Sequence, residues 1–196
     1  MNKLFTLNEL NVKAEQLQKK SEDRSEIRTI KFLDKHYSRI DNLKSLMGDF
    51  PAPGEAHFLW TLNSFNAFTF IVYVIKHCGK IEDLTLSTYS INDRILSSLT
   101  KWYDKGEIEQ VNISISDSIK HRMPRVYDQL ESQSATRNMN VHYTWNHSKV
   151  TLMKTAAHHF VVEGSGNFSE NAQNEQYLFM NDPELYNFRR TCILPN

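Results

Sequence analysis

The chain has 196 residues, 40% hydrophobic and 23% charged, which suits one folded domain with a small extension and excludes a disordered or fibrous protein. Lysine plus arginine number 23, as do aspartate plus glutamate, so any affinity for a polyanion has to come from a local patch. The two cysteines, Cys78 and Cys192, are far apart, which excludes a disulfide framework and a cysteine zinc cluster and favours a reducing compartment.

The chain shows no segment of the kind that enters a membrane. The start, Met1–Phe5, lacks the apolar core of a signal peptide, and the most apolar stretch, Phe65–Ile75, is too short to span a bilayer. We therefore expect a cytoplasmic protein without a membrane partner.

The first 50 residues differ in pattern from the remainder. Apolar residues recur at helical spacing between about Thr6 and Met47, a segment without glycine or proline, which predicts one or two amphipathic helices. Turn-forming residues then fill Gly48–Gly54. The sequence predicts an N-terminal helical extension over residues 1–50 and a domain over residues 55–196.

Strands and helices are predicted to alternate in the first half of this domain. Asn63 or Ser64 can cap the first helix, Gly79 can end it, and Asn92 or Asp93 can open the second. This alternation predicts right-handed crossovers and an α/β fold with a mixed, mostly parallel sheet flanked by helices. The predicted strands are 57–62, 83–89 and 111–116, and the predicted helices are 65–77 and 93–105.

The second half is predicted to hold more strands with shorter connections. A helix over about 117–132 is interrupted by Pro124, and a final helix opens with a capping Asp182 and Pro183. The connection Ala156–His158 is too short for a helix, so it predicts a hairpin. The predicted strands are 141–145, 149–154 and 160–163, followed by an apolar strand that begins near Glu175.

Residues suited to phosphate chemistry follow one another near this hairpin. His147 and Lys149 are two apart at the head of a strand, so their side chains share one face of the sheet. The run Gly164–Asn167 offers close backbone approach through Gly164 and Gly166, with Ser165 and Asn167 as donors. Glu175 supplies a carboxylate that can orient a histidine.

In order and kind these residues resemble the signature of the phospholipase D-like superfamily, which is His-x-Lys, then Gly-Ser-x-Asn, then a glutamate. Residues Asn146–Tyr177 carry the specific resemblance, and the region 55–145 resembles the superfamily only in architecture. The single copy of the motif is similar to that of members from phages and mobile elements. The resemblance implies a metal-independent phosphodiesterase that needs no cofactor.

The resemblance also implies a role for each residue. His147 attacks phosphorus and forms a phosphohistidine, while Lys149 and Asn167 stabilise the charge on the phosphate oxygens. Ser165 holds the phosphate or the loop, and Glu175 fixes the tautomer of a histidine. Because members of the superfamily use two histidines, a chain with one motif implies a homodimer with the site at its two-fold interface.

One position departs from the pattern of the superfamily. The motif continues His-x-Lys with four residues and an aspartate, and that position is Lys154 in this chain. This replacement leaves open a second interpretation, in which the fold binds nucleic acid without turnover.

A basic cluster outside the motif admits two interpretations. Lys120, Arg122 and Arg125, with His121, lie near the start of the predicted helix over 117–132. They either bind the phosphates of a nucleic acid or form a solvated helix start.

Simpler interpretations of the histidines and tryptophans also stay open. His147 suits an ordinary strand end and Gly164–Asn167 an ordinary turn, and adjacent His158 and His159 point to opposite faces of a strand, which disfavours a shared metal. The remaining histidines are expected to be structural or on the surface. The three tryptophans, Trp60, Trp102 and Trp145, are expected to be core or rim residues, with Trp145 near enough to His147 to touch a ligand.

The leading hypothesis is therefore a nuclease. The basic clusters and the expected absence of a lipid-binding segment favour nucleic acid over lipid as the substrate. The alternatives are a catalytically impaired nucleic-acid-binding module, and a scaffold whose N-terminal helices carry the function.

Overall fold

The structure, a computed structural model, describes residues 42–61, 66–169 and 174–194. Residues Leu43–Asn196 form one compact unit. The predicted N-terminal helices lie outside the described residues, apart from a helical stretch over residues 42–47. The predicted extension and domain bounds therefore stay predictions, as does the capping role of Asn63 or Ser64.

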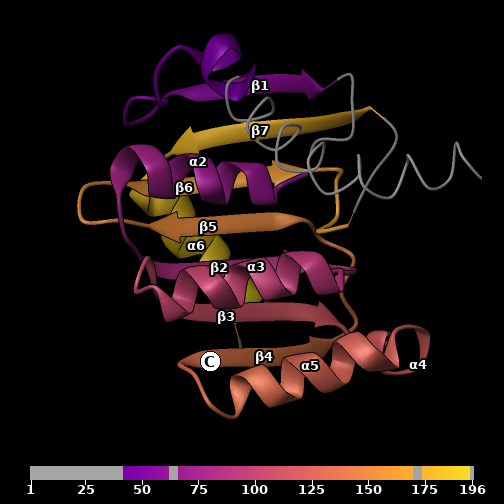
Figure 1. The fold of residues 1–196 in the computed structure, drawn as a ribbon. Helices are drawn as coiled ribbons and strands as arrows, with labels where there is room; N and C mark the ends of the chain where they lie inside the picture. Colours follow the sequence, from indigo (N-terminus) through magenta and orange to yellow (C-terminus); the bar gives the residue numbers. More distant parts are fainter. Residues whose placement is uncertain (1–41, 62–65, 170–173, 195–196) are drawn as a thin grey trace, which may run out of the picture. The chain divides into compact units, whose positions relative to one another are not determined.

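The described part is a mixed sheet with helices on both faces, which confirms the predicted α/β class (Figure 1). The strands are β1 (Ala56–Thr61), β2 (Ile81–Thr88), β3 (Ile108–Ser116), β4 (Met139–Thr144), β5 (Val150–Lys154), β6 (His159–Gly164) and β7 (Glu175–Asn181). The helices are α2 (Phe68–Cys78), α3 (Asp93–Asp104), α4 (Ile119–Arg122), α5 (Pro124–Ser134) and α6 (Pro183–Ile193).

The strand order differs from that of a mostly parallel sheet. The order is β1-β7-β6-β5-β2-β3-β4, and only the pairs β2–β3 and β3–β4 are parallel among the six pairs of described strands. All strands except β5 and β7 nevertheless run in the same direction. The strands β1, β2, β3 and β4 are therefore parallel as predicted, but β5, β6 and β7 insert between β1 and β2 and make most pairings antiparallel.

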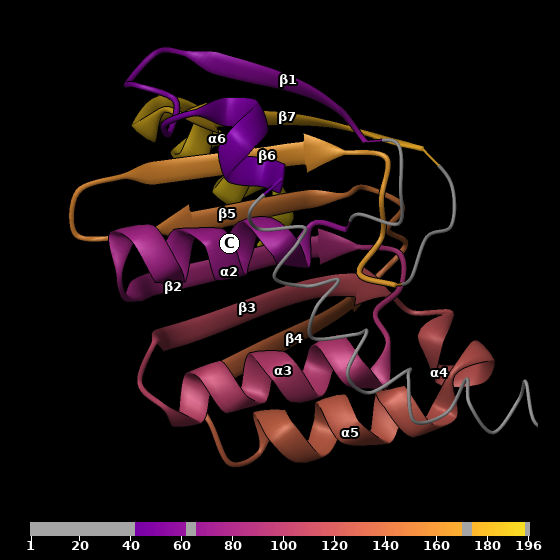
Figure 2. The ribbon, with the colours of Figure 1, turned by 45° about the horizontal axis from the view of Figure 1, so that its top comes forward.

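The helices form a layer on each face of the sheet. Figure 1 shows α2 and α3 in front of the sheet and α6 behind it, and Figure 2 shows α5 alongside α3. On the α2 face, the Phe70 ring lies 5.3 Å from that of Tyr177 and 5.2 Å from that of Phe179. On the α6 face, Leu152 and Tyr186 are buried in a smaller cluster. The two clusters fix both faces of β5, β6 and β7.

Three helix ends follow the predicted capping chemistry. Asn92 Oδ1 accepts a hydrogen bond from Ile95 N at 2.9 Å, and Asp182 Oδ1 accepts one from Leu185 N at 2.8 Å. Gly79 ends α2 with φ of 83°, a left-handed value that glycine adopts without strain. These caps set where each helix meets the edge of the sheet.

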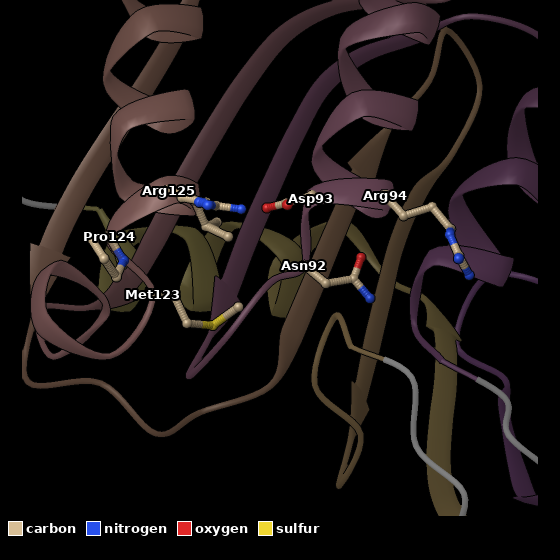
Figure 3. Close-up of a pocket in the computed structure, with 7 residues that line it drawn as sticks. Asn92, Asp93, Arg94, Met123, Pro124 and Arg125 are labelled. Carbon is tan, nitrogen blue, oxygen red and sulfur yellow. The ribbon is translucent and has the colours of Figure 1, made fainter.

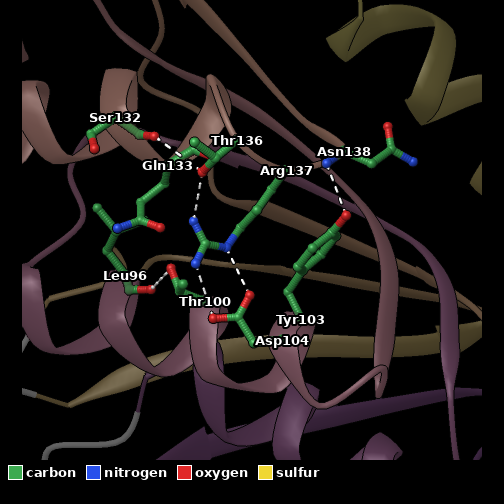
Figure 4. A network of polar contacts seen from close by, with 9 residues as sticks. All are labelled: Leu96, Thr100, Tyr103, Asp104, Ser132, Gln133, Thr136, Arg137 and Asn138. Atoms are coloured by element: carbon green, nitrogen blue, oxygen red, sulfur yellow. Dashed lines mark hydrogen bonds and ion pairs between the residues drawn. The ribbon is translucent and has the colours of Figure 1, made fainter.

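A polar network joins the end of α3 to the start of β4 (Figure 4). Arg137 donates to both carboxylate oxygens of Asp104, at 2.8 Å from Nε and 3.0 Å from Nη2. The Tyr103 hydroxyl accepts a hydrogen bond from Asn138 N at 2.9 Å. The network lies at the edge of the sheet where the parallel strands begin.

Candidate active site

The predicted motif residues gather at one edge of the sheet, where β2, β3, β4 and β6 end and β5 and β7 begin. The register brings these ends together, because Ser87 of β2 pairs with both Ser114 of β3 and Val150 of β5, and Gly164 of β6 pairs with Tyr177 of β7. In α/β sheets the carboxyl ends of parallel strands are the usual position of a ligand site.

His147 and Lys149 lie in direct contact just before β5. Lys149 Nζ is 2.9 Å from His147 Nδ1 and 2.7 Å from the His147 carbonyl oxygen. A charged ammonium can only donate, so Nδ1 is the acceptor and a neutral imidazole then carries its proton on Nε2. His147 is exposed and Lys149 half-buried, so the pair is open to a ligand.

Asn146 holds this segment in place. Its amide nitrogen donates to Ser87 Oγ at 2.8 Å and to the Ser114 carbonyl oxygen at 3.0 Å, and its Oδ1 accepts from Ser148 N at 2.9 Å. One side chain thus ties the His147 backbone to β2 and β3. This role of Asn146 was not predicted from the sequence, although an asparagine before a polar turn is a recognisable signal.

Ser165, which follows β6, and Glu175, which begins β7, are in direct contact. Ser165 Oγ donates to Glu175 Oε2 and accepts from Gln176 N at 3.1 Å. The backbone of the same loop is tied to the first segment, because Gly164 N donates to the Lys149 carbonyl oxygen at 3.2 Å. Ser165 is therefore hydrogen-bonded to the start of β7.

The electrostatics of Lys149 link it to Glu175. Burial lowers the pKa of the Lys149 ammonium below its ordinary value of 10.5, and the Glu175 carboxylate raises this pKa and so offsets part of the effect. Within the described residues, Glu175 makes no hydrogen bond to His147. Its predicted role in fixing a histidine tautomer is not met within one chain.

Asn167 lies against the end of β2. Thr88 Oγ1 lies 3.5 Å from Asn167 Oδ1 and donates to the Ser90 carbonyl oxygen at 2.9 Å. The amide nitrogen of Asn167 is a donor suited to an acceptor such as a phosphate oxygen. Gly166 is buried beside it. Phe168 fixes the loop, because its carbonyl oxygen accepts from Asn92 N at 3.0 Å.

A stack of side chains extends the site beyond the motif. The Tyr89 ring, just after β2, lies 4.9 Å from the His147 ring at an angle of 47°, and Arg122 Cζ lies 4.2 Å from the Tyr89 ring centroid. Arg122 Nε also donates to Ser118 Oγ at 3.1 Å. Arg122 is thereby brought to the site, whereas Tyr89 carried no signal in the sequence except its position after a buried strand.

The other two cations of the predicted basic cluster lie elsewhere. Lys120 Nζ is 4.9 Å from the Tyr143 ring centroid and 5.7 Å from that of Tyr127, on the side of α5. Arg125 lines a hollow of about 670 Å³ between the starts of α3 and α5. Figure 3 shows its side chain pointing toward Asp93 across this hollow. The cluster therefore does not form one patch.

Lys154 lies at the opposite edge of the sheet from the candidate site. It ends β5, and its ammonium is 3.1 Å from the Glu82 carboxylate. The extended chain from Lys149 to Lys154, at about 3.3 Å per residue, puts roughly 16 Å between them. The residue that departs from the predicted motif therefore does not touch the candidate site.

No helix in the described part of the chain is long and apolar enough to cross a membrane. Among the same residues, no group of three or more His, Cys, Asp or Glu side chains is arranged to hold a metal ion. The five motif residues His147, Lys149, Asn167, Ser165 and Glu175 offer one imidazole, one ammonium, one amide, one hydroxyl and one carboxylate.

Comparisons by sequence find neither a matching family model nor a matching curated protein. Solved structures do match. The fold is similar to that of polyphosphate kinase from Porphyromonas gingivalis, with a TM-score of 0.52 and 14% identity over 73% of this chain and 27% of that chain.

Two further structures match with lower scores. Phosphatidylserine synthase from Haemophilus influenzae Rd KW20 has a TM-score of 0.46 and 14% identity over 69% of this chain and 36% of that one. The archaeal chromatin protein TrmBL2 has a TM-score of 0.47 and 7% identity over 97% of this chain and 68% of that one. The polyphosphate kinase and the synthase belong to the phospholipase D-like superfamily, and this chain spans about a quarter to a third of their length.

Proposed function

We propose that the chain is a metal-independent phosphodiesterase that cleaves nucleic acid through a phosphohistidine at His147. The observation that carries the proposal is the contact of 2.9 Å between Lys149 Nζ and His147 Nδ1 at an exposed strand end. Ser165 and Asn167, which follow β6, and Glu175, which begins β7, lie at the same edge of the sheet as this pair. A nucleophile, a cation and an amide donor thus share one edge.

In the first step, His147 Nε2 attacks phosphorus, a P–N bond forms and the P–O bond to the leaving group breaks. Attack needs a lone pair on Nε2, so the imidazole proton has to reside on Nδ1. A bound phosphate attracts the Lys149 ammonium away from Nδ1 and allows this tautomer. In the second step water attacks phosphorus and gives its proton to the group that protonated the leaving oxygen in the first step, while the P–N bond breaks and His147 is regenerated.

Lys149 and Asn167 stabilise the phosphate oxygens during both steps. The ammonium provides charge and the amide provides a directed donor, and preorganised donors of this kind are typically worth several kcal/mol in the transition state. Arg122 packs on the Tyr89 ring, which in turn contacts the His147 ring, so we propose that Arg122 contacts a neighbouring phosphate of the same strand.

The leaving oxygen needs a proton donor, and we propose that His147 of a second copy supplies it. Nucleophile and acid act on opposite sides of phosphorus, which a two-fold axis through the site provides. Glu175 contacts Ser165 and not His147 in its own chain, so it is free to orient the histidine of the second copy. We propose a homodimer in the cytoplasm.

The test is cleavage of single- and double-stranded DNA in EDTA by the parent protein and His147→Ala. We expect the substitution to lower the rate by roughly a thousandfold or more, because it removes the group that forms the covalent intermediate. The fold should persist, since His147 is exposed. His77→Ala is a matched control, because His77 is exposed at the end of α2, at the other edge of the sheet.

Equal rates in the parent and His147→Ala would contradict the proposal. Salt-sensitive DNA binding without turnover in either protein would identify a binding module instead. The replacement of the motif aspartate gives this alternative little support, because Lys154 pairs with Glu82 away from the site.

A further inference from the structure

A hollow of about 660 Å³ lies beside the candidate site, between the strands β1, β7, β6 and β5 and the helix α6. Two of its lining residues, Lys149 and Gly164, also belong to the candidate site. A ligand in the hollow therefore lies next to any phosphate that Lys149 binds. Cavities of this size typically hold molecules as large as a nucleotide.

Two exposed aromatic side chains line the hollow on the side of β1. Phe58 and Trp60 are two residues apart on one strand, so both point to the same face of the sheet. They are 84% and 63% exposed. Exposed rings grouped in one place indicate a binding surface more often than a stable solvated face. Of the two expected positions for Trp60, core or rim, the exposure excludes the core.

The charges of the hollow favour an anionic ligand. Arg189 Nε and Nη2 contact the two carboxylate oxygens of Glu163 at 2.5 and 3.2 Å, so these two charges neutralise each other. Lys149 leaves the lining net positive. Gln176 adds an exposed amide that can donate and accept hydrogen bonds. Flat apolar rings, an amide and a cation together match a nucleobase joined to a phosphate better than an acyl chain.

We propose that the hollow binds an unpaired nucleotide of a single-stranded nucleic acid, with its base stacked on Trp60. Three strand spacings of about 4.8 Å separate β1 from β5, roughly 14 Å, so the stacked base belongs to a nucleotide near the cleaved linkage and not at it. The bases of a duplex are stacked on one another and are not free to enter. This inference rests on the proposed function and names its substrate class.

The test measures binding in a His147→Ala background, where turnover does not interfere. Trp102→Phe and Trp145→Phe leave Trp60 as the one tryptophan of the chain. We expect a single-stranded oligothymidine to quench its fluorescence to saturation. With Trp102 and Trp145 retained, Trp60→Ala should weaken oligothymidine binding by roughly tenfold or more, since each base stacked on an aromatic ring contributes on the order of one decade in affinity.

Phe188→Ala is the matched control. Phe188 is 57% exposed on α6 and is not among the residues that line the hollow, so this variant should bind oligothymidine as the background protein does. Trp60→Ala should weaken the binding of duplex DNA less than the binding of oligothymidine, because a duplex offers no unpaired base to the Trp60 ring.

Several outcomes would overturn the inference. One is equal affinity of Trp60→Ala and the background protein for oligothymidine. A second is an equal loss of affinity for oligothymidine and for duplex DNA on Trp60→Ala. A third is quenching of the Trp60 fluorescence by phosphatidylglycerol vesicles and not by DNA. A fourth is a halved molar mass of Trp60→Ala in sedimentation, which would make Trp60 a subunit contact. The binding result is independent of cleavage, so Trp60-dependent binding without any turnover would refute the phosphodiesterase and not this inference.

Discussion

Lys149 has two electrostatic neighbours with opposite effects on the site. Its ammonium donates to His147 Nδ1 at 2.9 Å, and the Glu175 carboxylate favours its charged form. Burial acts against that charge. The protonation of one lysine therefore decides both how strongly the site attracts phosphate and which nitrogen of His147 carries the proton.

The pKa of Lys149 predicts the alkaline limb of the pH–rate profile. Because burial lowers this pKa below 10.5, we expect kcat/KM to begin to fall at lower pH than an ordinary lysine would dictate. Glu175→Gln removes a charge that raises the pKa, so the limb should move to still lower pH. The measurement is kcat/KM for DNA cleavage across the alkaline range.

Glu82→Gln is the matched control, because it makes the same charge change beside Lys154 at the far edge of the sheet. An alkaline limb that stays at the same pH in Glu175→Gln would contradict the assignment of the limb to Lys149.

At the scale of elements, the site depends on the close approach of β6 to β7. A Cβ atom at Gly164 would lie 2.5 Å from the Gln176 carbonyl oxygen and 2.5 Å from Tyr177 Cδ1. Such contacts are too short for any side chain, so the strands can approach only because this residue is glycine. The next residue, Ser165, then reaches Glu175.

Gly164→Ala should therefore destabilise the fold by about 1–3 kcal/mol, the usual cost of forcing an extra methyl group into a packed region. It should also lower DNA cleavage by displacing Ser165. Urea unfolding measures the first effect and the cleavage rate the second. A variant with an unchanged free energy of unfolding would contradict the predicted clash.

The polar network between α3 and β4 predicts how the free energy of unfolding depends on pH. Arg137 holds the pKa of Asp104 below its ordinary value of 3.8, through its hydrogen bonds first and its charge second. The folded pKa is lower than the unfolded one, so the stabilisation is complete above 3.8 and is lost as pH falls through the folded value.

Asp104→Asn should thus be less stable than the parent at neutral pH, and the difference should shrink as pH falls below 3.8. Urea unfolding at a series of pH values measures it. Arg137→Gln removes the other partner and should give the same pH dependence. A difference that does not change with pH would exclude the ion pair as its cause.

At the scale of the whole molecule, the sequence predicted the helices and strands better than it predicted which strands pair in the sheet. Periodicity reports which face of a strand is buried, so the order of strands and helices and the caps at Asn92 and Asp182 could be predicted. It does not report which strand lies beside which, so the pairing of β1 with β7 could not.

The same limit applies to the candidate site. The contact between His147 and Lys149 follows from their spacing on one strand end. Tyr89 and Trp60 come to the site or its neighbouring hollow from other elements, and only the sheet order places them there.

The proposed dimer predicts a characteristic result for mixed subunits. If each site uses two copies of His147, roughly a quarter of the dimers carry both histidines after equal amounts of parent and His147→Ala are unfolded and refolded together. DNA cleavage should then fall to about a quarter of that of the parent, not to the half expected of independent chains. Sedimentation should give twice the mass of one chain. A cleavage rate of one half of the parent rate in the mixed sample would contradict the shared site.

The ion pair between Lys154 and Glu82 lies at the end of β5 that is remote from the candidate site. Since β5 carries the reactive group at one end and this pair at the other, the two ends can be engineered independently. Libraries that randomise the far end can be screened for thermal tolerance alone, and fluorescent labels or surface anchors attached there should leave the reactive end accessible.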